Sequence, residues 1–121
     1  MNNDTLTMGD LRQFTGSEQC YRHGLARKVL FTDGAKYLAD KGGAYWLIDL
    51  IALAQHPSHP AAAEPFQLWT MRVTPNNTGT VTCEDGNGRE VFRHVLDYTD
   101  FPLPEVQLYC TDNTILLPSE Y

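Results

Sequence analysis

The sequence has few of the residues that mark several common classes of protein. Its three cysteines, Cys20, Cys83 and Cys110, lie far apart, so we expect reduced thiols and a cytoplasmic protein rather than a disulfide framework. The first ten residues, MNNDTLTMGD, contain neither a basic nor an apolar stretch, so no export signal is expected. The longest apolar run, AYWLIDLIALA at 44–54, is much shorter than the ~20 residues of a membrane-spanning helix. No membrane partner is therefore expected.

Basic residues are scarce in the second part of the chain. Residues 42–121 contain three Lys/Arg against ten Asp/Glu, a balance of −7, whereas residues 1–41 have a balance of +1. Affinity for nucleic acid depends on cations that displace counterions around phosphate, so direct nucleic-acid binding is disfavoured. A basic surface of another protein is the favoured partner.

The composition is that of a compact globular protein. The chain has 121 residues, of which 42% are hydrophobic and 20% charged. This length can bury a sizeable core. We therefore expect residues 1–121 to form a single α+β domain.

Two short helices are indicated near the N-terminus. Thr7 can cap the first, because its hydroxyl is placed to accept a hydrogen bond from the amide three residues later, and Leu11 would face inward. The second, GAKYLADK, follows Thr32 as a cap and ends at the paired glycines Gly42 and Gly43.

A third helix is predicted from about Ala44 to Gln55. It is apolar on nearly every side, and its polar stripe joins Asp49, Ala52 and His56. Such a helix has to be covered on most faces. Asp49 in the middle of the run is expected to be partly exposed, rather than a buried functional carboxylate.

The remainder of the chain alternates between apolar and polar residues and is broken by the turn sequences PNNTG, DGNG and TDN. We expect N-terminal helices packed on one face of a mainly antiparallel sheet of four to five strands. A small hairpin about Gly24 would lead into a further strand, LARKVLF at 25–31. The predicted strands of the sheet are FQLWTMRVT (66–74), TVTCE (80–84), REVFRHVLDY (89–98), EVQLYC (105–110) and TILLP (114–118).

The segment HPSHP at 56–60 has two interpretations. Proline excludes the preceding residue from a helix, so the segment can simply be where the buried helix stops. Alternatively, Cys20, His23, His56 and His59 are four ligand types that zinc accepts, which would suggest a small metal-dependent enzyme or metal-binding domain. The first interpretation is favoured, because the two histidines of HPSHP lie in a loop and lack helical spacing. No metal and no cofactor is therefore assigned.

No residue is assigned a catalytic role. No serine lies in a G-x-S-x-G elbow. Cys83 and Cys110 fall within predicted strands, where a thiol is more often a small core residue than a nucleophile. His94 alternates with Phe92 and Leu96 and is expected to be partly buried rather than a general base.

The acidic second part, with its aromatic residues, is the remaining candidate for function. Carboxylates at strand ends and in loops can be a solvated surface that keeps the protein soluble, or a face that attracts a basic partner, with aromatic side chains as anchors. The second interpretation requires these groups to converge into one electronegative surface. The predicted partner-binding residues are Glu84, Asp85, Glu90, Asp97, Tyr98, Asp100, Phe101, Glu105 and Tyr121.

Three segments, LRQFTGSEQCYRH, TDGAKYLADKGGAYWLIDLIA and LYCTDNTILLPSEY, resemble those of an uncharacterised family of short bacterial proteins carried on plasmids and prophages. The resemblance implies no activity, cofactor or catalytic residue. It does imply a setting, in which small acidic proteins inhibit host defence, as anti-CRISPR proteins do. The leading hypothesis is therefore a non-enzymatic inhibitor of a host nucleic-acid-handling protein that acts by protein-protein contact. A self-associating subunit, such as a homodimer, is a further hypothesis.

Overall fold

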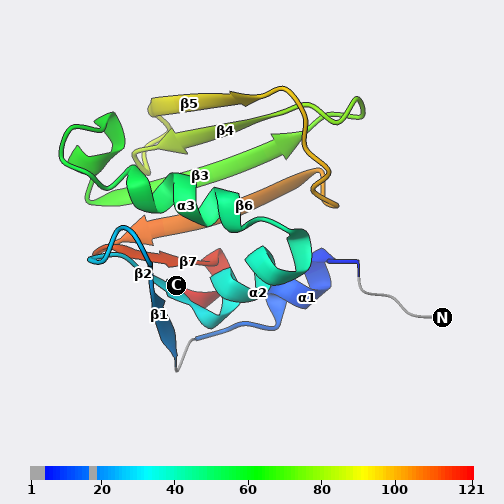
Figure 1. Ribbon diagram of the computed structural model, residues 1–121, viewed down its shortest axis with the longest axis horizontal. Helices are drawn as coiled ribbons and strands as arrows, with labels where there is room; N and C mark the ends of the chain where they lie inside the picture. The colour runs from blue at the N-terminus through cyan, green and yellow to red at the C-terminus, as the bar shows by residue number, and fades with distance from the viewer. Residues whose placement is uncertain (1–4, 17–18) are drawn as a thin grey trace.

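The computed structural model describes residues 5–16 and 19–121 and has an α+β fold (Figure 1). Its helices are α1 (Met8–Arg12), α2 (Asp33–Gly42) and α3 (Tyr45–Leu53), with short 3-10 helices η1 (Pro60–Ala63) and η2 (Pro118–Glu120). Its strands are β1 (Cys20–Arg22), β2 (Leu30–Thr32), β3 (Phe66–Val73), β4 (Gly79–Glu84), β5 (Glu90–Leu96), β6 (Glu105–Thr111) and β7 (Thr114–Leu116). In Figure 1, α3 crosses in front of β3 and β6, and α1 and α2 lie on the same side nearer β7.

The seven strands form one sheet in the order β1-β2-β7-β6-β3-β4-β5. All neighbours pair antiparallel except β2 and β7, which are parallel. The expected α+β class is confirmed, but the expectation of four to five strands is wrong. The difference arises at the β1 end of the sheet, where β1 and β2 have three residues each and are too short to show a clear alternation.

The strand predicted at 25–31 is wrong over its first part. The side chain of His23 accepts hydrogen bonds from the amides of Leu25 and Ala26, and the amide of Val29 donates to the carbonyl of Ala26. These bonds form a turn, so only the end of the predicted strand becomes part of β2 (Leu30–Thr32). The turn joins β1 to β2 as an antiparallel pair, in agreement with the hairpin predicted about Gly24.

The predicted helix caps are confirmed. Thr7 Oγ1 accepts from the amide of Asp10, and Thr32 Oγ1 accepts from the amide of Ala35. Helix α2 ends at Gly43, whose φ of 61° lies in the left-handed region that glycine tolerates best. The prediction for the polar stripe of α3 is partly wrong, because Ala52 is buried.

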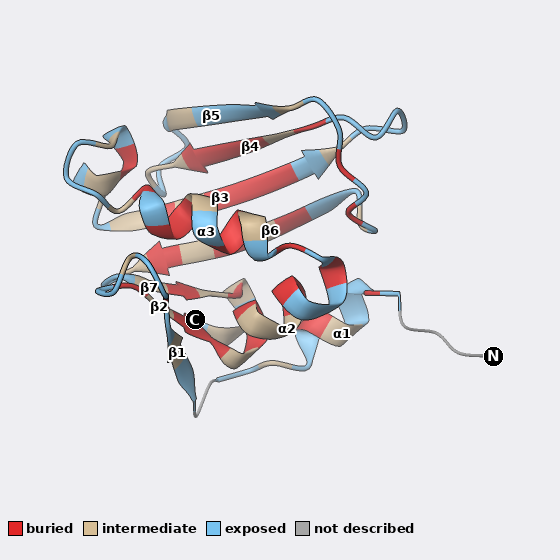
Figure 2. Cartoon of the chain, viewed as in Figure 1, coloured by how far each residue is buried: buried red, intermediate tan, exposed pale blue. Residues whose placement is uncertain are grey.

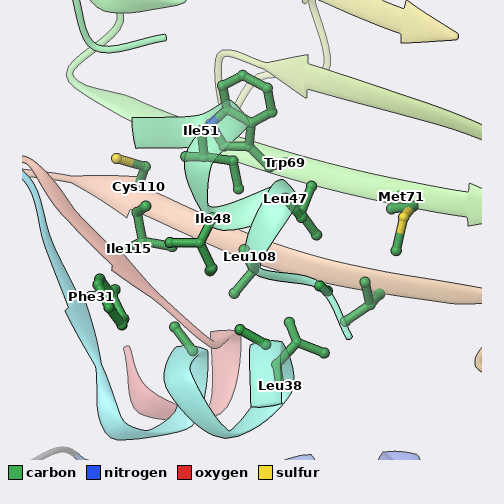
Figure 3. Packing of buried hydrophobic residues seen from close by; sticks show 14 of the residues in the cluster. Phe31, Leu38, Leu47, Ile48, Ile51, Trp69, Met71, Leu108, Cys110 and Ile115 are labelled. Carbon is green, nitrogen blue, oxygen red and sulfur yellow. The ribbon is translucent and has the colours of Figure 1, made fainter. Parts of the chain in front are cut away.

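The core lies between the helices and the near face of the sheet (Figure 3). Ile48 and Ile51 of α3 pack with sheet residues that include Trp69, Leu108 and Ile115, all of them almost fully buried. Figure 2 shows that β3 and β4 are largely buried, whereas β5 at one edge of the sheet is largely exposed. Among the described residues, no helix is long and apolar enough to cross a membrane.

Candidate protein-binding site

The predicted acidic face is divided between opposite ends of the sheet. The register of β4 and β5 places Glu84 opposite Glu90 at one end, and Gly79 opposite Leu96 at the other. Glu84, Asp85 and Glu90 therefore lie together, whereas Asp97 follows the far end of β5, separated by the length of the strand, roughly 20 Å. These carboxylates therefore do not form the single electronegative surface that the interaction hypothesis requires.

Half of the six predicted carboxylates are also paired within the molecule. Arg89 contacts both Asp85 (3.2 Å) and Glu64 (3.3 Å), and Arg93 contacts Glu90 at 2.8 Å. The backbone amides of Asn87 and Arg89 are the main reason that the pKa of Asp85 is lowered, and the hydrogen bond from Arg93 lowers the pKa of Glu90. These charges are already partly compensated, which weakens their attraction for a partner.

Glu105, at the other end of the sheet, is likewise paired. It lies opposite Arg72 in the register of β3 and β6, and the two side chains form an ion pair at 3.3 Å. Both side chains are about half exposed, so the pair contributes little to stability. It nevertheless removes Glu105 from the set of free carboxylates.

The carboxylates of Asp97 and Asp100 differ from these three, because neither makes a hydrogen bond or an ion pair with a described residue. The carboxylate of Glu84, at the other end of the sheet, is likewise without an ion pair in the described residues. Tyr98 between them is 68% exposed, and Val95 at the end of β5 is 63% exposed. We call these four residues the Tyr98 patch: Val95, Asp97, Tyr98 and Asp100. Segment 95–100 thus carries exposed apolar and aromatic side chains close in sequence to two carboxylates without ion pairs.

The conformation of the loop explains why the patch faces outward. Thr99 is buried, and its amide donates to the carbonyl of Asn77 in the β3–β4 turn at 2.8 Å. The amide of Phe101 donates to Thr99 Oγ1, and the Phe101 side chain is only 5% exposed. Because Thr99 and Phe101 point inward, Tyr98 and Asp100 are left on the outer side.

Two of the predicted anchors are therefore revised. Phe101 is not a surface anchor, since its ring packs in the core within reach of Gly42 and Leu6. Tyr121 is 73% exposed, but its ring contacts Phe66 and Tyr109 near the opposite end of β6, away from the Tyr98 patch. Val95, which the sequence analysis missed, belongs to the patch instead. Its position on an edge strand was the signal that could have identified it.

His23 and Asp49 form the closest approach of a base and an acid in the described residues. His23 Nε2 lies 2.7 Å from Asp49 Oδ1, and His23 Nδ1 accepts from the amides of Leu25 and Ala26. Because Nδ1 accepts two hydrogen bonds, the ring proton is on Nε2 and is donated to the carboxylate. Neither ring nitrogen is left to take a proton from a substrate, so the pair stabilises the turn before β2. The side chain of Asp49 is 56% exposed, in agreement with the prediction of partial exposure.

The four candidate zinc ligands are not brought together. Within residues 5–16 and 19–121, no group of three or more His, Cys, Asp or Glu side chains is arranged to hold a metal ion. His56 Nδ1 contacts Ser58 Oγ at 2.8 Å, and His59 Nδ1 accepts from the amide of Ala61 at the start of η1. HPSHP is thus the place where a buried helix stops and a 3-10 helix begins.

The cysteines have different environments. Burial raises the pKa of both the Cys83 and the Cys110 thiol to about 12, so neither is a thiolate at neutral pH. This agrees with the prediction that both are core residues. Cys20 is exposed on β1, at the opposite edge of the sheet from β5.

Comparison with known proteins adds a family but no activity. One family model, described only as a family of unknown function, matches residues 5–121. No curated protein and no solved structure matches the chain.

Proposed function

Because the chain belongs to DUF6876, a family of unknown function, we propose its function from geometry alone: it is a non-enzymatic protein that binds a basic surface of a partner protein through the Tyr98 patch. The observation that carries this proposal is the pair of unpaired carboxylates, Asp97 and Asp100, on either side of an exposed tyrosine.

Physical chemistry favours this combination for recognition. Tyrosine is enriched among residues that dominate binding energy, because it buries a large rigid surface and keeps a polar tip. Unpaired carboxylates beside it attract lysine or arginine on a partner and accelerate association. The buried anchors Thr99 and Phe101 hold the loop, so little conformational entropy is lost when Tyr98 is covered.

A narrower proposal concerns the identity of the partner. The small size, the net charge of −6 and the resemblance to proteins of bacterial mobile elements support an anti-CRISPR-like inhibitor of a host nucleic-acid-handling protein. The dispersed carboxylates argue against mimicry of a continuous phosphate backbone. Inhibition would therefore act through the local Tyr98 patch.

The test is affinity capture from the source cells with three baits. Wild type is compared with the double variant Asp97→Lys/Asp100→Lys and with the control Glu84→Lys/Asp112→Lys, whose carboxylates make no ion pair with a described residue and lie outside the patch. We expect the patch variant to lose a protein that wild type and the control both retain. Tyr98→Ala should weaken capture of that same protein by ~2 kcal/mol, about 30-fold in Kd.

Two outcomes contradict the proposal. Equal capture by all three baits would show that the patch is not the binding surface. Loss of capture by both double variants would indicate a response to overall charge, and would remove the special role of Asp97 and Asp100. Circular dichroism of each bait verifies that the fold is retained.

A further inference from the structure

A second surface, independent of the Tyr98 patch, lies along β6. Strand β3 pairs with all of β6, from Thr111 to Glu105, whereas β7 pairs only with Tyr109, Cys110 and Thr111. In Figure 1, β7 accordingly lies beside the arrowhead half of β6, and no strand lies on that side of its first half. Although β6 is an inner strand of the sheet, its first half therefore has no strand partner on the side where β7 pairs with its second half.

The hydrogen-bond pattern identifies the groups at this edge. The amide of Val73 donates to the carbonyl of Pro104, so residues 104, 106 and 108 bond to β3, and residues 105 and 107 point away from it. No described residue makes a hydrogen bond with the backbone amide or carbonyl of Glu105 or Gln107 on that side. These four polar groups are the ones that an additional strand would use.

The C-terminal segment explains why β7 stops. Pro118 lacks an N–H and cannot continue the ladder opposite Gln107. The amide of Leu117 donates instead to the Glu120 carboxylate at 2.9 Å, and Ser119 Oγ donates to the carbonyl of Leu11 in α1. These bonds fix the C-terminal segment as η2 against α1 and do not extend β7 along β6.

The space left between α1, the C-terminal segment and β6 is a groove of about 430 Å³. Its lining is mainly apolar, with Met8 and Leu11 from α1, Val106 from β6, and Leu117 and Pro118 from the C-terminal segment. Arg12 also lines the groove and makes no ion pair with another described residue. Glu105 also lines the groove but is paired with Arg72, so Arg12 is the lining charge without an ion pair to a described residue.

We propose that this groove binds an extended peptide segment of a partner protein, which adds to β6 as a strand. Its backbone bonds to the free amides and carbonyls of Glu105 and Gln107, as in other cases of strand addition. Side chains directly opposite each other on neighbouring strands share a face, so the peptide residue opposite Val106 points into the apolar groove and should itself be apolar. A carboxylate near one end of the peptide would pair with Arg12.

Hydrogen exchange of the free protein tests the premise. The amide of Val106 is bonded to β3 and should exchange slowly, whereas the amide of Gln107 should exchange at least ~100-fold faster. Equal protection of the two amides would mean that the edge is already occupied, and would overturn the proposal.

The binding test uses a random heptapeptide library displayed on phage and selected on the full chain. An enriched peptide is synthesised and titrated into ¹⁵N-labelled protein. We expect the NMR chemical shifts of the Gln107 and Glu105 amides to change, and the Gln107 amide to become protected from hydrogen exchange. N-methylation of the peptide at residues that face β6 should weaken binding at least ~10-fold, whereas N-methylation at the alternate residues should not.

Charge reversal provides the matched protein control. Arg12→Glu should weaken binding of an enriched acidic peptide ~10-fold or more, whereas Arg27→Glu, at an exposed arginine outside the groove, should leave it unchanged. The proposal is overturned if no enriched peptide shifts the Gln107 amide, or if both N-methylated forms bind equally. It is also overturned if no peptide protects the Gln107 amide from hydrogen exchange but dimerisation at high protein concentration does. The occupant of the groove would then be a second copy of the chain.

Discussion

A buried glutamine offers the sharpest test of how the loop after α3 is held. Gln67 on β3 is 2% exposed, and its amide nitrogen donates to Gln55 Oε1 (2.9 Å) and to the carbonyl of Ala61 (2.8 Å). Its oxygen accepts from Gln55 Nε2 (2.8 Å) and from Trp69 Nε1 (2.9 Å). One side chain thus joins the end of α3, the 3-10 helix η1 and the sheet.

Replacement of Gln67 by leucine keeps the approximate volume and removes every one of these bonds. Trp69 is 1% exposed, so water cannot replace the lost partner of its ring N–H. The Ala61 carbonyl loses one hydrogen bond but keeps the one from the amide of Glu64. The unsatisfied Trp69 N–H costs ~1–3 kcal/mol, and the hydrogen bond lost at the Ala61 carbonyl costs ~1 kcal/mol. The additional apolar surface of leucine offsets ~1 kcal/mol. We expect Gln67→Leu to lower the free energy of unfolding by ~2 kcal/mol, a substantial part of the ~5–15 kcal/mol typical of a domain.

Thr82 on the adjacent strand β4 is the matched control. It is also 2% exposed, but its hydroxyl has no hydrogen-bond partner among the described residues. Thr82→Val removes this unsatisfied group, so the variant should be as stable as wild type or more stable by up to ~1 kcal/mol. Urea unfolding followed by circular dichroism measures both variants against wild type. A cost below ~1 kcal/mol for Gln67→Leu, or a clear loss of stability for Thr82→Val, would refute the reasoning.

Two further predictions follow from the pKa shifts. A thiol reagent at about pH 8 should label only Cys20 in the native protein and all three cysteines after unfolding. The reason is that burial raises the pKa of Cys83 and Cys110 to about 12. Rapid labelling of all three thiols in the native protein would contradict this. Burial lowers the pKa of His59, so the unfolded chain binds a proton more readily, and stability should fall as pH falls below the unfolded value of about 6.5. His59→Asn keeps an N-cap acceptor and should reduce the fall in the free energy of unfolding as pH falls below about 6.5. An unchanged dependence of that free energy on pH would exclude His59 as its cause.

Local signals were sufficient to predict the helices and the larger strands. Helix α2 begins after Thr32 and ends at paired glycines because capping and left-handed backbone depend on residues that are adjacent in the sequence. The turn residues Asp112 and Asn113 both have positive φ, as expected for the tight turn between β6 and β7. In contrast, the parallel pairing of β2 with β7 joins distant segments, and no local pattern specifies it.

The dispersal of the acidic residues, which the sequence left open, has a different physical origin. Residues 42–121 contain three arginines, Arg72, Arg89 and Arg93, and each forms an ion pair with a carboxylate. Arg72 reaches a carboxylate on the neighbouring strand, Arg89 one across a turn, and Arg93 one on its own strand. A net charge counts these carboxylates as if they were free, although their partners are set by the sheet. The negative charge that has no ion-pair partner is therefore local, and its position depends on which loop residues point outward. In residues 97–101 that choice follows from the inward side chains of Thr99 and Phe101, so two buried residues leave the carboxylates of Asp97 and Asp100 available to a partner.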